Sequence, residues 1–196
     1  MMRAVCLALA LLASHAWGFD LAALEQQLAH HQRIHGQFSQ SRFIPGLAAQ
    51  LQSHGRFVMD RQQGLLWQLA QPWQLNLRLT TQGLAQQQDG QWLSLNAQHA
   101  SSHTSRLFLA LLRGDRAELD KLFDSQLSGS STQWQLTLQP KSLLLKQIFA
   151  RIDVHGGALL EQIDLHDTSG EHTRLTFSAQ HTDQPLSPQE ALDLAP

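Results

Sequence analysis

Apolar and polar residues alternate with a period of two along much of the chain, which predicts strands that bury one face and expose the other. In the first half, such runs cover residues 35–44, 55–61, 65–69 and 73–80. Asp89-Gly90 is typical of a tight turn between two further short strands. The apolar side chains that share one face within the last three of those runs are Phe57, Met59, Leu65, Trp67, Leu69, Trp73, Leu75, Leu77 and Leu79.

The alternation resumes in the second half of the chain, after an apolar interruption near residue 107. Strands are predicted over 123–129 and 133–140, and the Leu-rich residues 143–150 are expected to continue the sheet. The closing strands are IDVHG (152–156), ALLEQIDLHD (158–167) and EHTRLTFSA (171–179), with a turn at Thr168-Ser169-Gly170 between the last two. Short turns imply antiparallel neighbours, so the pattern predicts one antiparallel sheet of about ten strands.

Helical spacing appears in three places. Asp20 is placed to cap a helix with Leu21, Leu24 and Leu28 on one face and Gly36 near its end. LFLALL (107–112) is apolar nearly all round, which suits a short buried helix. The spacing of Asp115 and Glu118 resembles a capping box for a helix through Leu119, Leu122 and Phe123, and residues 184–196 are expected to be a loose tail or short helix. If such a sheet curls incompletely around two helices, it leaves an apolar cavity between sheet and helices.

The N-terminus has the pattern of a secretory signal. A positive start with Arg3 is followed by the apolar run 4–13, which is too short to span a bilayer. Ala16 and Gly18 are small residues that favour cleavage before Phe19. We therefore expect a signal peptide over 1–18, a single domain over 19–196 and a periplasmic location. The only cysteine, Cys6, lies inside the apolar run, so neither lipidation nor a disulfide is expected in the mature chain.

Composition and motifs argue against several function classes. The chain has 14 Lys and Arg against 16 Asp and Glu and no basic stripe, which argues against nucleic acid as a partner. It has no phosphate-binding loop, dinucleotide fingerprint or G-x-S-x-G nucleophile motif, so we expect neither an enzyme nor a cofactor. A hairpin turn explains His155-Gly156-Gly157 better than an oxyanion motif does. His31 and His35 are four residues apart, but no third ligand is evident, so no metal site is expected.

The stretch HGRFVMDRQQGLLWQLAQP (54–72) resembles the LolA family of periplasmic carriers of outer-membrane lipoproteins. The matching features are Gly55, Arg61, the Leu65-x-Trp67 strand and Gln71-Pro72. Further matches are GQFSQSRFI (36–44) with Phe38 and Gln40, QLTLQP (135–140), and Asp167, Gly170, Thr173 and Phe177 in the closing strands. The chain departs from the family at Gln62, where the family has Pro, and at SPQEALDLAP (187–196), which replaces a final strand with a Pro-x-Gly ending.

The resemblance implies an incomplete antiparallel β-barrel covered by lid helices, with an apolar interior that holds acyl chains. It implies that Arg61 holds the lid closed through hydrogen bonds. It also implies a monomer that takes lipidated cargo from an inner-membrane transporter to an outer-membrane acceptor without a covalent step. The expected cavity residues are Phe38, Phe57, Met59, Leu65, Trp67, Leu69, Leu75, Leu77, Phe108 and Leu111. Two alternatives stay open: a carrier of a non-lipoprotein acyl or glycolipid product, and a structural assembly module without a cavity.

Overall fold

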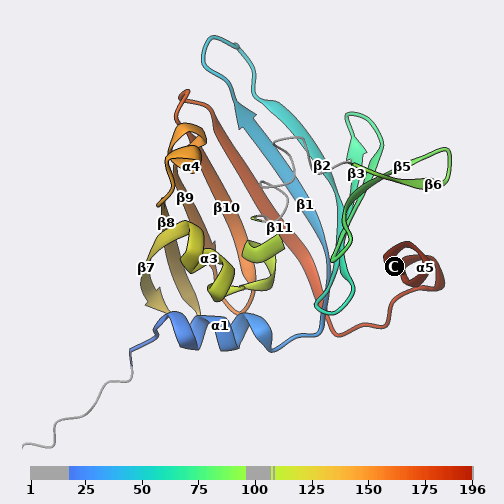
Figure 1. The fold of residues 1–196 in the computed structure, drawn as a ribbon, viewed down its shortest axis with the longest axis horizontal. Helices are drawn as coiled ribbons and strands as arrows, with labels where there is room; N and C mark the ends of the chain where they lie inside the picture. Colours follow the sequence, from blue (N-terminus) through green and yellow to red (C-terminus); the bar gives the residue numbers. More distant parts are fainter. Residues whose placement is uncertain (1–17, 96–106, 108, 196) are drawn as a thin grey trace, which may run out of the picture.

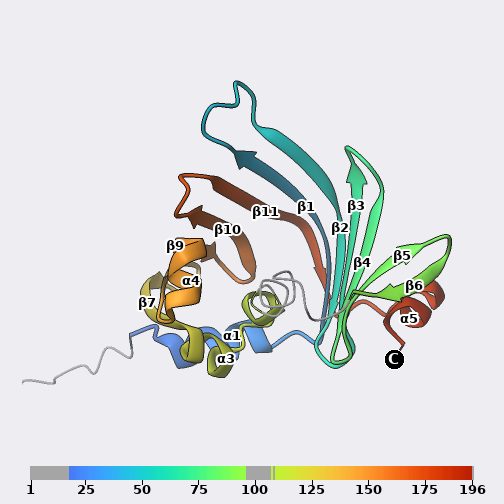
Figure 2. The ribbon, with the colours of Figure 1, turned by 45° about the horizontal axis from the view of Figure 1, so that its top comes forward.

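The computed structural model describes residues 18–95, 107 and 109–195, and within them eleven strands form one antiparallel sheet. The strands are β1 (Arg33–Phe43), β2 (Leu51–Asp60), β3 (Gly64–Gln71), β4 (Leu75–Thr80), β5 (Gly83–Gln88), β6 (Gln91–Ser94), β7 (Phe123–Ser130), β8 (Gln133–Pro140), β9 (Phe149–Gly156), β10 (Leu160–Asp167) and β11 (His172–Thr182). Their spatial order is β6-β5-β4-β3-β2-β1-β11-β10-β9-β8-β7. The sheet is strongly curved, and its edge strands β6 and β7 do not meet (Figures 1 and 2).

The helices lie on both sides of this sheet. They are α1 (Leu21–Ala29), α3 (Arg116–Leu122), α4 (Leu143–Ile148) and α5 (Pro188–Leu194). Residues 107 and 109–113 are also helical, and we call them the lid segment. Figure 2 shows α1 and α3 on the concave side of the sheet and α5 behind β3 and β4. The helices and the sheet therefore share one main core on the concave side.

A second, smaller core lies on the convex side. It consists of Val58, Leu66 and Leu194, with Trp92 and Leu186 packed against it. Successive strand residues point to opposite faces, so β2 and β3 can contribute apolar side chains to both cores.

The predicted fold class, a mainly β curved sheet that stays open and is covered by helices, is confirmed. Asp20 caps α1 by accepting a hydrogen bond from the Ala23 N–H at 2.8 Å. Gly36, however, does not lie near the end of this helix, which stops at Ala29. It belongs to β1, where an added Cβ would lie 2.6 Å from the Phe57 ring.

Several local predictions were wrong. Trp73 precedes β4 and is 65% exposed instead of sharing a strand face with Leu75. The Leu-rich residues 143–150 were expected as strand but form α4 before β9 begins at Phe149. Phe123 is the first residue of β7 and not part of α3. The C-terminal residues form α5, the helical one of the two expected forms, with a complete capping box between Ser187 and Glu190. Within the described ranges, no helix has the length and hydropathy that a bilayer span requires.

Candidate functional site beneath the helices

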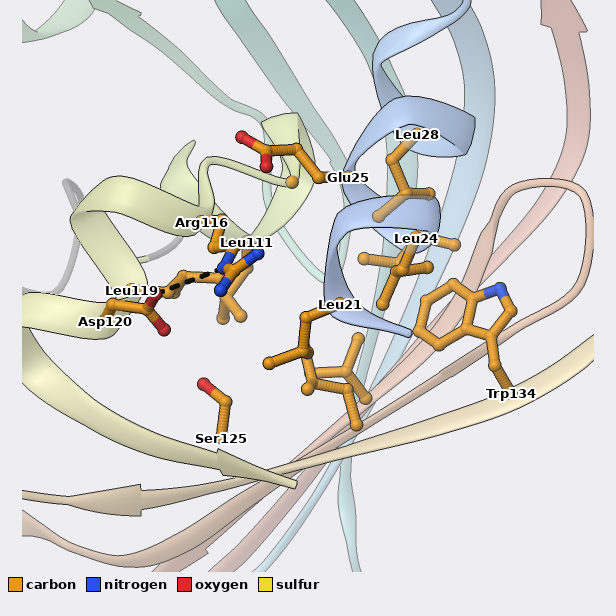
Figure 3. A pocket seen from close by; sticks show the side chains of 14 residues that line it. Leu21, Leu24, Glu25, Leu28, Leu111, Arg116, Leu119, Asp120, Ser125 and Trp134 are labelled. Atoms are coloured by element: carbon orange, nitrogen blue, oxygen red, sulfur yellow. Dashed lines mark hydrogen bonds and ion pairs between the residues drawn. The ribbon is translucent and has the colours of Figure 1, made fainter. Parts of the chain in front are cut away.

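An enclosed apolar space lies where α1, the lid segment and α3 face β8. Leu21, Leu24 and Leu28 of α1 point into it, opposite Trp134 of β8 (Figure 3). The lid segment contributes Leu111 and α3 contributes Leu119. The space has a volume of about 30 Å³, room for roughly one or two water molecules. In this conformation the helices themselves fill most of the space over β7 to β10.

A second gap of about 10 Å³ lies nearer the middle of the sheet. Phe57 and Met59 of β2 line it, together with Leu112 of the lid segment and Phe177 of β11. The two gaps flank Leu28, which lines both. Movement of α1 and the lid segment away from the sheet would therefore join them into one larger apolar space.

Four aromatic side chains pack together on the concave face. Phe38 and Trp67 are stacked with their ring centroids 3.6 Å apart. Phe57 and Phe177 meet edge to face at 5.4 Å. These rings form a rigid apolar floor that spans β1, β2, β3 and β11.

The remaining predicted cavity residues differ in how far they are buried. Leu65 is buried in the main core, whereas Leu69, Leu75 and Leu77 of β3 and β4 are only partly buried. Leu111 is 3% exposed and lies in the lid segment over the sheet. Phe108 lies outside the described residues. The structure thus brings together Phe38, Phe57, Met59, Leu65, Trp67 and Leu111, and it places Leu69, Leu75 and Leu77 at the partly open side of the same face.

Arg61, at the turn between β2 and β3, ties both helical elements to the sheet. Its Nε donates to the carbonyl oxygen of His31 at 2.9 Å, and its Nη2 donates to that of Leu28. Its Nη1 donates to the carbonyl oxygen of Arg113 at 2.8 Å, at the end of the lid segment. One side chain thus satisfies carbonyl groups at the ends of two helices, which have no partner within their own helix.

The burial of two neighbouring positive charges, Arg61 and Arg113, opposes the attachment of the helices to the sheet. Burial lowers the pKa of Arg61, and the positive charge of Arg113 lowers it further. Burial likewise lowers the pKa of Arg113, whose Nε and Nη2 are buried without a hydrogen-bond partner in the described structure. Asp60 lies close by. Burial alone would raise its pKa, but hydrogen bonds from the N–H groups of Gln63, Gln62 and Arg33 bring the pKa below its ordinary value.

The histidines do not form the helical pair that their spacing suggested. His31 lies past the end of α1 and contacts Asp183 at 2.7 Å, whereas His35 is in β1 and lies 3.4 Å from Glu190. No cluster of three or more potential metal ligands occurs in the described part of the chain. His155-Gly156-Gly157 lies at the hairpin between β9 and β10, as expected. The carbonyl oxygen of Gly157 accepts hydrogen bonds from Trp134 and Gln27.

The sequence reasoning missed the contribution of α1 to the enclosed space. Leu21, Leu24 and Leu28 had been placed on one helical face, but their spacing does not say which strands that face covers. Trp134 and Leu136 of β8 were also missed. Their alternation in QWQLTLQP was a usable signal, because it puts both residues on the same face of a strand.

These features agree with the comparison with known families. The model of the family described as "Outer membrane lipoprotein carrier protein LolA" matches residues 29–190. The chain belongs to the LolA family. The match begins at the last residue of α1 and ends within α5, so it includes all eleven strands.

Solved structures share the fold at low sequence identity. The LolA superfamily protein NE2245 from Nitrosomonas europaea is 10% identical, with a TM-score of 0.51 over 87% of this chain and 94% of that one. MucB is 13% identical, with a TM-score of 0.52 over 88% of this chain and 62% of that one. A search of curated protein sequences finds no match. The description of the family is that of carrier proteins.

Proposed function

We propose that this protein is a periplasmic carrier that binds acyl chains between the curved sheet and its helices. In this role it moves a lipoprotein or other lipidated cargo from an inner-membrane transporter toward an outer-membrane acceptor. The observation that carries the proposal is the set of hydrogen bonds from Arg61 to Leu28, His31 and Arg113. They fasten the helices over an apolar face through one side chain, which is what a reversible lid requires.

Competition between lid and cargo for one surface explains how release needs no covalent step. Each buried methylene contributes about 0.8 kcal/mol, so a chain of roughly 16 carbons contributes about 13 kcal/mol gross. The leucines of α1 and the lid segment cover this surface when cargo is absent. Cargo must displace them, and its net affinity is lower by the free energy of closure.

The two arginines set the balance between the closed and the open state. Arg61 favours closure through three hydrogen bonds, whereas Arg113 opposes it because its Nε and Nη2 are buried with no hydrogen-bond partner among the described residues. Opening returns the Arg113 guanidinium to water and gives up the Arg61 bonds. The states therefore differ by a small free energy, so cargo can shift the equilibrium.

Replacement of the fastening side chain tests this role. Arg61→Leu removes the three hydrogen bonds and favours the open form, so the variant is expected to take up a fluorescent fatty acid faster. It is also expected to transfer cargo to acceptor membranes at least tenfold more slowly, because the lid no longer competes. Uptake is measured by fluorescence, and transfer by the appearance of cargo in acceptor vesicles.

Arg56→Leu is the matched control, because Arg56 lies in β2, the strand that leads to Arg61, and is exposed on the convex face. It should leave both rates unchanged within about twofold. Transfer by Arg61→Leu at the wild-type rate would count against the lid role. If the wild-type protein binds neither fatty acid nor an apolar dye, the carrier proposal itself is wrong and an assembly module is favoured.

The cargo class is tested separately. Purification from the periplasm, followed by organic extraction and mass spectrometry, identifies what the protein holds. Acylated peptides would support lipoprotein cargo. Free fatty acyl or glycolipid species without peptide would instead favour the alternative carrier function.

A further inference from the structure

Exposed apolar side chains gather at one end of the sheet. Of the nine large hydrophobic residues that are exposed in the described ranges, six lie at the end opposite the β2–β3 turn. We call these six the rim: Phe43, Leu47, Leu51, Trp73, Leu143 and Leu144. They come from the β1–β2 hairpin, the β3–β4 turn and the start of α4, which all lie toward the top of Figure 1; Figure 2 shows α4 well apart from the two turns.

The packing of α4 on the sheet does not explain why Leu143 and Leu144 are apolar. Leu145, which is 8% exposed, and the partly buried Ile148 anchor α4 to the main core, whereas Leu143 is 81% exposed and Leu144 57%. The same holds for Trp73, which is 65% exposed in a turn where a small polar residue would serve. Single exposed leucines are ordinary, but several at one end of a protein indicate a contact surface.

The charges beside the rim include cations that can meet lipid headgroups. Two of the three lysines of the whole chain, Lys141 and Lys146, flank the α4 leucines. Lys141 lies 3.4 Å from Asp124, and Arg42 lies 2.5 Å from Glu171, so the acidic side chains Asp124 and Glu171 are each paired with a cation. Lys146 is exposed in the last turn of α4. An amine next to exposed leucines can reach lipid phosphates while the leucines enter the acyl region.

We infer that the rim docks on the surface of a lipid bilayer that contains anionic lipids. The apolar side chains stand on the tips of three separate elements, and a bilayer accepts such tips side by side without a matching groove. Trp73 suits this position because tryptophan prefers the membrane–water interface. The partly buried Leu69 and Leu75 flank the β3–β4 turn, so apolar surface continues from the rim onto the concave face.

The test is co-sedimentation of the purified protein with vesicles of phosphatidylethanolamine and phosphatidylglycerol, and with phosphatidylcholine vesicles for comparison. Wild-type protein is expected to bind the anionic vesicles more tightly. Leu143→Glu combined with Leu144→Glu should lower the partition coefficient at least tenfold. Lys146→Gln should weaken binding to the anionic vesicles only, by about two- to fivefold.

Leu192→Glu is the matched control, because Leu192 is a leucine with 68% exposure on α5, away from the rim. It should bind like the wild type within twofold. As a second measurement, lipids brominated near the headgroup should quench tryptophan fluorescence in the wild type and less in Trp73→Phe. The inference would be overturned if the wild type bound neither kind of vesicle, or if the Leu143→Glu/Leu144→Glu variant bound as tightly as the wild type. It would also be overturned if Leu192→Glu lowered binding as much as that double variant does. Fatty-acid uptake, measured in parallel, should be unchanged in the rim variants and tests the carrier proposal independently.

Discussion

The two halves of the concave face differ in how deeply their inward side chains are buried. On β8 to β11 the inward side chains are almost fully buried: Trp134, Leu136, Leu138, Ile152, Val154, Ile163, Leu175 and Phe177. On β3 and β4 the inward Leu65 and Leu79 are also buried, but Trp67, Leu69, Leu75 and Leu77 are only partly buried. The two halves have similarly apolar sequences, so the difference comes from what covers them.

The helices are placed mainly over the first half. The space under α1 and α3 is lined from the sheet side by β7, β8, β9 and β10, and α3 packs against β7. The second half is instead supported from behind, where α5 packs against β3 and β4. One half is thus covered by helices on its concave side, and the proposed carrier role assigns the less covered half to the guest.

Truncation of one side chain in each half measures this difference directly. Ile163→Ala in the filled half is expected to lower the free energy of unfolding by about 3 kcal/mol, because Ile163 is 0% exposed and leaves a cavity. Leu77→Ala in the other half should cost less than about 1 kcal/mol and weaken fatty-acid binding instead. Urea denaturation and a fluorescent fatty acid provide the two measurements. Equal destabilisation by the two substitutions would show that the halves do not differ.

The back of the filled half carries a network of two buried carboxylates and the cations that pair with them. Asp153 and Asp164 lie directly opposite each other on β9 and β10. Asp164 accepts hydrogen bonds from Arg174 at 2.7 Å and from His172 at 2.9 Å. Arg151 binds Asp153 at 2.7 Å in the same way. Paired cations make it possible to bury two adjacent carboxylates.

Removal of one of these charges on the convex side should destabilise the filled half. Asp164→Asn is expected to lower the free energy of unfolding at pH 7 by about 2 kcal/mol, because the Arg174 guanidinium loses its carboxylate. Asp124→Asn is the control, since Asp124 is exposed and 3.4 Å from Lys141, and should cost less than about 0.5 kcal/mol. Urea denaturation of both variants checks the difference, and similar losses would contradict it.

The same network predicts the direction of the acid response. Burial would raise the pKa of Asp164, but hydrogen bonds from Arg174, Gln162 and His172 hold the pKa below its ordinary value. The folded pKa is therefore below the unfolded one. The contribution of Asp164 is present above about pH 4 and is lost as the pH falls through the folded pKa. Asp164→Asn should lose less stability than the wild type in that window.

The sheet could be predicted from the sequence because alternation records directly that a strand has one buried face. In residues 55–60, Phe57 and Met59 reach the main core and Val58 the smaller one, as period two requires. Residues 143–148 were misassigned because three consecutive leucines have no period. The usable signal was Ser142, whose hydroxyl accepts a hydrogen bond from the Leu145 N–H at 3.2 Å and caps α4.

The site was harder to predict than the fold, because it depends on which helix covers which strands. Arg61 and the β2–β3 residues were placed through family resemblance, and periodicity alone would not have singled them out. The role of α1 over β8 follows from packing between segments that lie more than a hundred residues apart. The hydrogen bond of Gln27 to the carbonyl oxygen of Gly157 is one such contact, and no local pattern reports it.

The helix caps offer the smallest and most local test of the comparison. Ser187→Ala removes the cap of α5, behind β3 and β4, and Ser142→Ala removes that of α4, beside β8 and β9. Each should cost about 1 kcal/mol. If the halves are supported separately, Ser187→Ala should raise amide hydrogen exchange in α5 and β4 and leave β9 protected. Ser142→Ala should do the reverse, because α4 contacts only the filled half. Faster exchange across both halves in either variant would mean that the sheet responds as one unit, and the division of the concave face would then concern exposure and not stability.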